Sequence, residues 1–449
     1  MTRQLAGFLA AARFEDLSPE TVEHTQRAVL DWLGSALAGS IEPPARMAQG
    51  VAAGLGTSND ATVFSAGRRS AAGAAFANGV ASHILEFDDV HKGSTLHPAA
   101  PVIPAVLAVA EREHASGRDF LLAVALGYDA ALRIGEAANP SHYRFWHPTG
   151  TAATFGAAAA AGRLVKLTPE QMVDALGSAG TQAAGLWEFN ADGAMSKHLH
   201  PGKAAMNGVL AADLARAGFT SATRILEGER GFLRAMSTSC NASAITAGLG
   251  THWKIAENCY KLHACCGHTH TAIDAALELR SSALGRIAAV RIATYGPGFE
   301  IVREPNPRTP YQAKFSIAYC VAAALVEGRV GLAQFSADRF GAKGVRDPAV
   351  GALVRHTTVT VADDLTARYP AAWPARIEIA LHDGTVLRGA ADYPRGNPEN
   401  PVSTVALEDK FAALAGGRFG ADAVARATAA LSAIRDAEDM AGVFCDVLP

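Results

Sequence analysis

The sequence carries little charge and no long run of basic residues. Charged residues make up 18% of the 449 residues, and the formal net charge is -3. A general nucleic-acid-binding protein needs a concentrated positive surface, which this chain lacks. We therefore expect no nucleic-acid partner, and any positive charge that matters for function must be local.

Long runs of large apolar residues are also missing. The most apolar run, residues 149–162, is short and built from small residues, whereas a membrane span needs roughly 20 large apolar ones. Glu15 and Asp16 interrupt the N-terminal apolar patch before a signal peptide can develop. Six cysteines in so long a chain, two of them adjacent, do not resemble a secreted disulfide framework. We expect a buried helix at 149–162, no membrane contact and a cytoplasmic location.

The short motifs of nucleotide, serine-hydrolase and metal sites are absent as well. There is no G-x-x-x-x-G-K-[ST] loop, no G-x-G-x-x-G between a strand and a helix, and no G-x-S-x-G elbow. The 15 histidines and 6 cysteines show neither His-x3-His nor Cys-x2-Cys spacing. These absences favour acid–base chemistry on an anionic small molecule, with no cofactor and no metal.

Apolar periodicity predicts two regions of different structure. Apolar residues recur every three to four positions from Thr21 to about Met236, which indicates successive helices. Alternating patterns typical of strands appear only at 287–296, 356–364 and 375–393, the last around an Asp383-Gly384 turn. Residues 311–328 are predicted to form one buried helix. The fold class is therefore mainly α: a large all-helical domain (1–268 and 397–449) and a smaller α+β domain (269–396).

Three His-Pro pairs precede helical segments made of small residues: His97-Pro98, His147-Pro148 and His200-Pro201. Proline suits the first helical turn and pushes the preceding residue toward extended geometry, so each histidine is predicted at or just before a helix start. The positive end of a helix attracts anions and disfavours a protonated imidazole. Each pair therefore predicts an anion site with a possible base, or else an ordinary capping turn.

Two lysines strengthen the interpretation of the third pair. In a helix starting near Pro201, Lys203 would lie in the first turn, where a cation opposes the helix dipole unless an anion neutralises it. With Lys197 and His200 nearby, the stretch is typical of a carboxylate or phosphate pocket. The alternative is a set of solvated surface charges.

Acidic residues stand close to histidines in "ILEFDDVHKGSTLHP", which contains Glu86, Asp88, Asp89 and His91. Clustered carboxylates beside histidines hold a metal or orient a base. The spacing favours orientation of a histidine, or capping of a helix, over metal binding.

Two later segments contain candidate polar residues. In "YKLHACCGHTH" we favour a buried turn with one functional lysine, Lys261, over a metal site or a cysteine nucleophile. In "AKFSIAYCVAAAL", Ser316 and Tyr319 are three residues apart and hence on one helix face. The alternative for that segment is a core helix whose tyrosine finds a backbone partner.

These segments, with "WHPTGTAATFGAAAAAGRL" and "MSKHLHPGKAAMNGVLAADLARAGF", resemble the MmgE/PrpD family in order and spacing over nearly the whole chain. That family contains 2-methylcitrate dehydratases, cis-aconitate decarboxylases and iminodisuccinate epimerases. The resemblance implies a helical domain, a smaller α+β lid and a homodimer. It also implies the catalytic residues His97, His147, Lys197, Lys261 and Tyr319, and the substrate-binding residues Glu86, Asp88, Asp89, His91, His200, Lys203, Cys266 and Ser316.

The chain departs from the family pattern at two positions. Some members carry Thr where this chain has Val90, and the decarboxylases are expected to carry His where this chain has Cys266. We predict a cofactor-independent hydro-lyase that removes an α-proton from a small di- or tricarboxylate of the 2-methylcitrate type, in a pocket drawing on both domains. The alternatives are a decarboxylase of the cis-aconitate type, an epimerase of the iminodisuccinate type, or a catalytically silent carboxylate-binding paralogue.

Overall fold

The computed structural model describes residues 1–444 and divides the chain into two compact units, which we treat separately. The helical unit holds residues 1–84, 88–258 and the chain from Ser403 onward. The sheet unit holds Leu85–Phe87 and Cys259–Val402. The predicted domain boundaries, 268/269 and 396/397, thus fall inside the sheet unit. Residues 445–449 of the predicted range 397–449 lie outside the described residues.

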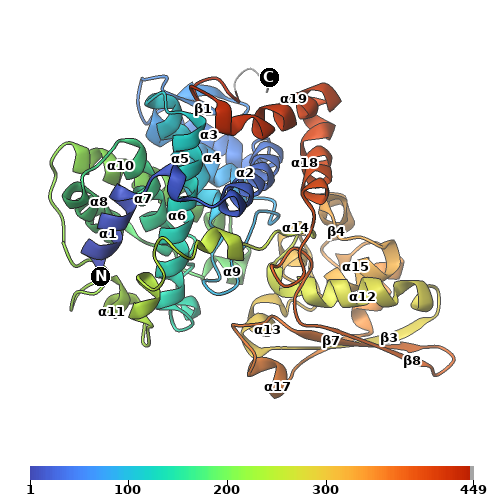
Figure 1. Ribbon diagram of the computed structural model, residues 1–449. Coiled ribbons are helices and arrows are strands. Elements are labelled where there is room, and N and C mark those ends of the chain that lie inside the picture. Colours follow the sequence, from blue (N-terminus) through green and yellow to red (C-terminus); the bar gives the residue numbers. More distant parts are fainter. Residues whose placement is uncertain (445–449) are drawn as a thin grey trace. The chain divides into compact units, whose positions relative to one another are not determined.

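Helices dominate the helical unit, and the chain is mainly α, as predicted (Figure 1). Its α-helices are α1 (Thr2–Ala11), α2 (Pro19–Gly39), α3 (Pro43–Ala52), α4 (Ala71–His83), α5 (Ala99–Arg112), α6 (Gly117–Ala138), α7 (Ala152–Leu164), α8 (Pro169–Gln182), α9 (Phe189–Asp192), α10 (Ser196–Arg216), α11 (Phe232–Met236), α18 (Thr404–Phe419) and α19 (Ala421–Ser432). Short 3-10 helices are η1 (Phe14–Asp16), η2 (His142–Arg144), η3 (Ala242–Ile245), η4 (Lys254–Glu257) and η8 (Ile434–Asp436).

The prediction of an entirely helical first domain is wrong at one hairpin. Strands β1 (Ala61–Val63) and β2 (Gly67–Arg69) pair antiparallel. The backbone N–H of Thr62 donates to Glu111 Oε2 at 2.7 Å, and Arg68 Nη1 lies 3.1 Å from the same oxygen. Strands of three residues are too short for an alternating pattern to be visible in the sequence.

The apolar run at 149–162 forms the buried helix that we expected. Its residues 152–162 belong to α7, in which every residue except Arg163 is buried. Within residues 1–444, no helix combines the length and the apolar character needed to cross a bilayer.

Close approach of glycines brings α4 and α10 together. A Cβ added at Gly79 of α4 would lie 2.8 Å from the Cα of Gly202 in α10, a distance that real side chains do not reach. The two backbones can therefore touch only because neither residue has a side chain. Because His83 is the last residue of α4, this contact holds it near the first two turns of α10.

The three His-Pro pairs differ in their relation to helices. Pro98 is the N-cap of α5, so His97 stands just before a helix start, as predicted. His147 lies in a turn, because α7 begins only at Ala152. The third prediction is wrong: α10 begins at Ser196, and Pro201 lies inside it. The lysine in the first turn is consequently Lys197, and not Lys203.

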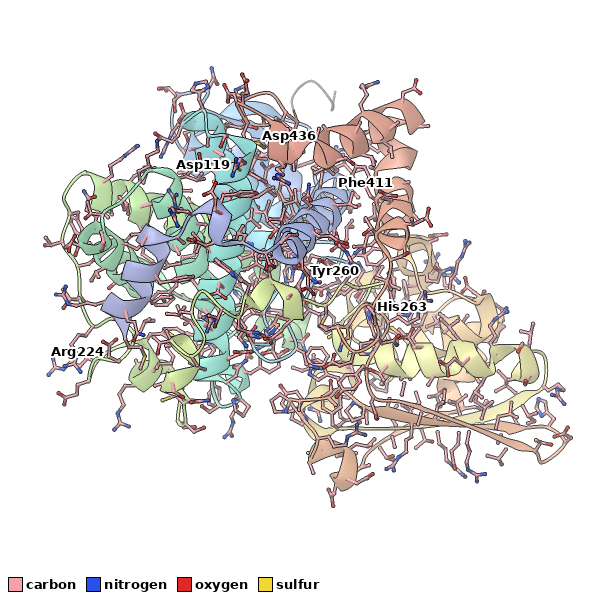
Figure 2. The ribbon with its side chains drawn as sticks, viewed as in Figure 1. Asp119, Arg224, Tyr260, His263, Phe411 and Asp436 are labelled. Atoms are coloured by element: carbon pink, nitrogen blue, oxygen red, sulfur yellow. The ribbon has the colours of Figure 1, made fainter. Side chains whose placement is uncertain are left out.

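The C-terminal helices return to the helical unit. Figure 2 marks Phe411 on α18, and its Cδ2 atom would lie 3.2 Å from a Cβ added at Gly34 of α2. Next to it, Lys410 Nζ donates to Asp31 Oδ1 at 2.6 Å, and both side chains are buried. The apolar contact and the ion pair together fix α18 against α2.

The sheet unit has a four-stranded sheet in the order β6-β3-β7-β8. Strands β3 and β6 are parallel, whereas β7 is antiparallel to both β3 and β8. Figure 1 shows α12 and α15 along one face of this sheet. The strands are β3 (Ile287–Thr294), β6 (Thr357–Val361), β7 (Ala375–Leu381) and β8 (Val386–Ala391), with a small pair β4 (Phe340–Gly341) and β5 (Gly344–Val345).

The other elements of the sheet unit are short apart from α12 and α15. The α-helices are α12 (His270–Ala283), α13 (Gly296–Val302), α14 (Pro310–Lys314), α15 (Ile317–Glu327), α16 (Pro348–Arg355) and α17 (Asp363–Thr366). The 3-10 helices are η5 (Gly267–Thr269), η6 (Leu332–Phe335) and η7 (Ala337–Arg339). The predicted strands at 287–296, 356–364 and 375–393 are confirmed, with Gly384 at φ +87° in the turn between β7 and β8.

The prediction of one continuous helix at 311–328 is wrong. The chain forms α14 and α15, and Ser316 between them has extended backbone geometry (φ -114°, ψ 100°). Its hydroxyl accepts from the backbone N–H of Tyr319 at 3.2 Å and donates to the carbonyl of Glu304 at 2.6 Å. Ser316 is therefore the N-cap of α15, because serine competes well for the donors at a helix start.

Candidate functional site

Three buried histidines from separate segments meet in the helical unit. They are His83 at the end of α4, His97 before α5 and His147 before α7, and we call them the histidine cluster. The ring centroids are 4.7 Å apart for His83 and His97, and 5.7 Å apart for His83 and His147. A ring nitrogen of each lies within 4.8 Å of the others. His97 and His147 were predicted as site residues, whereas His83 was not, because its only signal in the sequence is its position close to the acidic segment.

Asp88 and Asp89 fix the orientation of two of these rings. The Nδ1 atom of His83 lies 2.7 Å from Asp88 Oδ2, and Nδ1 of His97 lies 3.5 Å from the same oxygen. His97 Nδ1 also donates to the backbone carbonyl of Asp89 at 2.6 Å. A carbonyl can only accept, so in the neutral ring of His97 the proton resides on Nδ1. Asp88 and Asp89 of the acidic segment thus orient histidine rings through these hydrogen bonds, which is the role that the sequence pattern favoured.

The carboxylate of Asp89 is held by donors of the protein. Its Oδ2 accepts from the Tyr128 hydroxyl at 2.7 Å and from Asn258 Nδ2 at 2.8 Å, while Oδ1 accepts from the backbone N–H of Ala99 at 3.1 Å. Burial raises the pKa of Asp89 to about 7, and the carboxylates of Asp31 and Asp88 add to the rise. Asp89 thus anchors the start of α5 and, through its carbonyl, His97.

His147 and His200 form a pair of neutral imidazoles. Their Nδ1 atoms are 3.0 Å apart, so one must donate and the other accept. Burial lowers the pKa of His147 well below its usual range, and the neighbouring His200 and Lys197 add to the effect. Burial likewise lowers the pKa of His200 to about 4, with smaller effects from His83, Lys197 and Lys203. At neutral pH both rings are therefore uncharged and able to take a proton.

Small residues allow His200 to come close to His147. A Cβ added at Gly150 would lie 2.6 Å from the carbonyl oxygen of Ala184 and 3.1 Å from His200 Cβ. The aromatic ring of Trp187 lies 5.0 Å from that of His147, centroid to centroid, and Phe189 lies 5.5 Å from His200. The imidazole pair is thus enclosed on one side by backbone and on the other by aromatic rings.

Lys197 is buried, with 2% of its surface exposed, and its charge acts on both His147 and His200. As the second residue of α10 it adds positive charge where the helix dipole is already positive. The cation in the first turn is therefore Lys197, and the predicted carboxylate or phosphate pocket at this stretch stays a prediction. Lys203 lies farther along the helix and is half-buried.

His91 belongs to a different network from the histidine cluster. Its Nδ1 atom is 2.9 Å from Ser94 Oγ, and its Nε2 atom is 3.3 Å from Glu257 Oε2 and 3.7 Å from Glu136 Oε1. The ammonium group of Lys254 lies 3.0 Å from each of these glutamates. These contacts give His91 a structural role, and none of them indicates the substrate contact that we predicted.

In the sheet unit, two buried lysines contact the segment 85–87, and we call Glu86, Lys261 and Lys314 the lysine cluster. Lys261 Nζ donates to the backbone carbonyl of Glu86 at 3.1 Å and lies 3.6 Å from its Oε2. Lys314 Nζ donates to the carbonyl of Leu85 at 2.5 Å. Lys314 was not among the predicted site residues, because nothing in its local pattern links it to residue 85.

A backbone hydrogen bond holds the residue before Lys261 in place. Tyr260, labelled in Figure 2, donates its N–H to the carbonyl of Gly396 at 3.0 Å. Gly396 has φ +99°, and a Cβ there would lie 2.0 Å from the carbonyl oxygen of Tyr260. Only glycine fits this position, so the backbone around Lys261 has a fixed course.

Of the two tyrosines in this region, Tyr311 and not Tyr319 interacts with the lysine cluster. Burial raises the pKa of Tyr311, and the charges of Glu86 and Cys266 add to the rise. The hydroxyl of Tyr319 instead donates to the backbone carbonyl of Gln334. Its ring packs 5.8 Å from Phe335 and 5.3 Å from Phe340, centroid to centroid. These contacts agree with the alternative that Tyr319 is a core residue whose hydroxyl finds a backbone partner.

Cys266 and Ser316 are held by backbone interactions. The N–H of Cys266 donates to the carbonyl of Lys314 at 3.0 Å, which places Cys266 next to the lysine cluster. Ser316 caps α15, as described above, and both of its polar contacts are with backbone groups. The Ser316 contacts indicate a structural role, and the predicted substrate contact of Cys266 stays a prediction.

Two groups of side chains within residues 1–444 have the geometry to hold a metal ion: the histidine cluster, and His91 with Glu136 and Glu257. The sequence spacing did not reveal either group, because their members are far apart in the chain and only folding brings them together. The prediction that activity needs no metal rests on sequence spacing alone and stays a prediction. In the second group, the ammonium of Lys254 lies 3.0 Å from a carboxylate oxygen of each glutamate and so competes with a metal ion for them.

Comparison with known families identifies the chain as a member of the MmgE/PrpD family. Residues 3–244 match the MmgE/PrpD N-terminal domain, and residues 263–435 match the MmgE/PrpD C-terminal domain. The chain belongs to this family, as its sequence motifs indicated.

Individual relatives are similar along most of their length. The cis-aconitate decarboxylase-like protein oryM of Aspergillus oryzae is 27% identical over 92% of this chain and 90% of its own. The cis-aconitate decarboxylase of Aspergillus terreus is 28% identical over 93% of this chain and 89% of its own. The human cis-aconitate decarboxylase is 27% identical over 100% of this chain and 93% of its own. These similarities support the family and the decarboxylase alternative, but do not single out 2-methylcitrate dehydration.

Proposed function

We propose that this protein is a cofactor-independent lyase that acts on a small di- or tricarboxylate. The observation that carries the proposal is the buried set of neutral imidazoles His147 and His200 beside the cation Lys197. Removing a proton next to a carboxylate adds negative charge to an existing anion, so the reaction needs a base and a fixed positive charge together. The helical unit supplies both within one group of side chains.

The protonation state of the site favours dehydration as the reaction. A neutral His147 accepts the α-proton of a hydroxy acid, the electron pair forms a carbon–carbon double bond, and the hydroxyl leaves as water after taking a proton from a second group. His97 is our candidate for that second group, because Asp88 and Asp89 orient its ring. As an imidazolium it would carry the proton that the hydroxyl takes on the nitrogen not hydrogen-bonded to the Asp89 carbonyl. Lys197 would bind the carboxylate that stabilises the intermediate charge. The proposed substrate is a hydroxy acid of the 2-methylcitrate type.

Decarboxylation is the second candidate, favoured by the names of the relatives. In that reaction the carbon–carboxylate bond breaks, carbon dioxide leaves, and the electron pair left on carbon takes a proton from an acid. The same cation would stabilise the carbanion. His97 would again supply this proton, because the lowered pKa of His147 keeps that ring unprotonated.

The two candidates differ in product, and a pair of assays separates them. Purified protein is incubated with 2-methylcitrate and, separately, with cis-aconitate in D2O, and the products are followed by proton NMR and by release of carbon dioxide. A new double bond and loss of the hydroxyl support dehydration. Carbon dioxide release with deuterium on the product carbon supports decarboxylation. Absence of turnover on both, and on related hydroxy diacids, would contradict the proposed lyase activity.

Assembly and location complete the proposal. We propose a homodimer, as the family resemblance implies, and light scattering after size-exclusion chromatography measures it directly. A mass near the 46.5 kDa of one chain would contradict the dimer. The predicted cytoplasmic location stays a prediction.

A further inference from the structure

The histidine cluster has a property that acid–base chemistry does not require. A ring nitrogen of His83, His97 and His147 lies within 4.8 Å of one on each of the other two rings. Three neutral imidazole nitrogens are the protein ligands of one common type of zinc site, where they lie about 2.0 Å from the ion. In a tetrahedral site such nitrogens are about 3.3 Å apart, so small rotations of the rings would complete the geometry.

The contacts on the opposite side of the rings are those of metal-binding histidines. His83 Nδ1 faces the carboxylate of Asp88 at 2.7 Å, and His97 Nδ1 donates to the carbonyl of Asp89 at 2.6 Å. A metal-bound histidine usually makes such a hydrogen bond with its second nitrogen, which fixes the tautomer and directs the other nitrogen to the ion. In both rings the nitrogen directed inward is therefore Nε2.

An independent observation comes from His83 itself. The side chain is fully buried, and its Nε2 atom has no hydrogen-bond partner among the described residues. Leaving a buried polar atom without a partner costs free energy, so such atoms often mark a ligand. With Nδ1 bound to Asp88, this nitrogen can serve as a lone-pair donor. Imidazole ligands select zinc and the neighbouring transition metals over magnesium or calcium.

We propose that His83, His97 and His147 form a binding site for a Zn²⁺-type transition-metal ion, and that the bound ion inhibits the enzyme. The inhibition rests on the proposed function, because the ion would bind to His147, the proposed base, and to His97, the proposed acid. The binding does not depend on it. The fourth position of the ion is open to water or to a carboxylate.

The test of binding uses Co²⁺ as a spectroscopic probe and Zn²⁺ as a calorimetric one. Protein treated with a chelator and then freed of it is titrated with each ion. We expect one equivalent of Co²⁺ to produce the visible absorption of a tetrahedral site. His83→Ala should weaken binding by at least about 100-fold, and Asp88→Asn by about 10- to 100-fold, the usual effect of losing a partner of a metal ligand.

His91→Ala is the matched control, because it disrupts the other group of potential ligands. It should leave Co²⁺ binding at the histidine cluster unchanged, and thermal melts check that every variant is folded. Wild-type protein that binds no ion, or binding that survives both His83→Ala and Asp88→Asn, would overturn the site. Loss of binding in His91→Ala alone would assign the ion to His91, Glu136 and Glu257, and would also overturn the proposed site.

Turnover assays separate this inference from the proposed function. Zn²⁺ should inhibit the wild-type enzyme at the concentrations at which it binds, and chelator should restore the rate. If Zn²⁺ binds to the cluster and raises turnover, the inhibitory role and the cofactor-independent mechanism are both wrong. If no ion binds but the enzyme turns over, only the metal site is wrong.

Discussion

The histidine cluster and the lysine cluster accommodate buried polar groups in different ways. In the helical unit, burial lowers the pKa of His147 and His200, so that these rings lose their charge. In the sheet unit, the amino groups of Lys261 and Lys314 are held by backbone carbonyls and by the carboxylate of Glu86. Neutral buried imidazoles suit proton transfer, whereas buried ammonium groups suit the binding of negative charge.

The largest expected effect is on proton transfer. His147→Gln keeps a polar side chain of similar size but removes the base, and turnover should fall by about 10²- to 10⁴-fold. Steady-state kinetics on the substrate identified above measure this loss. A folded His147→Gln enzyme with nearly full activity would show that the histidine cluster is not the base.

Removal of the cation in the helical unit should have the next largest effect. Lys197→Met keeps the apolar stem and removes the charge, so kcat/KM should fall at least about 100-fold, the usual scale for a donor that stabilises a developing anion. Lys203→Met is the matched control and should lose much less, because that residue is only half-buried and farther along α10. Equal effects of the two changes would indicate a general electrostatic contribution in place of a specific one.

A third variant asks whether the lysine cluster takes part in the same reaction. We predict that Lys261→Met lowers kcat/KM by about 10- to 100-fold, since its amino group is the candidate partner of a second substrate carboxylate. Lys254→Met, which disrupts an ion-pair network in the helical unit, is the control and should affect mainly stability. Full activity in folded Lys261→Met would restrict the chemistry to the histidine cluster.

The two tyrosines allow a finer comparison. Tyr311→Phe should lower turnover by about tenfold if its hydroxyl acts beside Glu86, whereas Tyr319→Phe should leave turnover unchanged. The second change removes the donor to the carbonyl of Gln334, so it should cost about 1–3 kcal/mol of unfolding free energy. Denaturant melts and kinetics on both variants decide the matter. If Tyr319→Phe lowers turnover and Tyr311→Phe does not, Tyr319 is the functional tyrosine, as the family resemblance implies.

The smallest expected effect is on the pH dependence of stability. The pKa of His200 is lowered from 6.5 to about 4 in the folded protein. The unfolded chain therefore binds the proton first, and the stabilising contribution, fully present above pH 6.5, is lost as the pH falls toward 4. His200→Gln should flatten this part of the profile by on the order of 1 kcal/mol, after a discount for partial exposure. Melts at several pH values that fall in parallel for both proteins would contradict the assignment.

Asp89 should shift stability in the opposite direction. Its pKa is raised to about 7, so the folded state binds the proton more tightly. The contribution is complete below the usual carboxyl pKa of 3.8 and is lost as the pH rises through about 7. Asp89→Asn should remove this dependence. The two variants together separate the titration of the imidazole from that of the carboxyl.

Local patterns in the sequence were sufficient for much of the fold. The three strand segments and the Asp383-Gly384 turn were predictable, because alternation and turn chemistry act over a few residues. The break in the helix at Ser316 was not predictable. It depends on the hydrogen bond from the backbone N–H of Tyr319 to the Ser316 hydroxyl, and apolar periodicity does not reveal such a bond. The start of α10 at Ser196 was not predictable either, because a proline such as Pro201 indicates a helix start in the sequence, whereas helices tolerate an internal proline when packing compensates.

The sequence by itself determined the family and the mainly helical class, and its contiguous motifs predicted His97, His147 and Lys197 as site residues. Only the tertiary structure decided that His83 joins them and that Tyr311, rather than Tyr319, interacts with Glu86. The physical reason is that a site depends on distances between side chains from remote segments. Those distances are set by backbone packing such as the contact of Gly79 with Gly202, which no local pattern specifies.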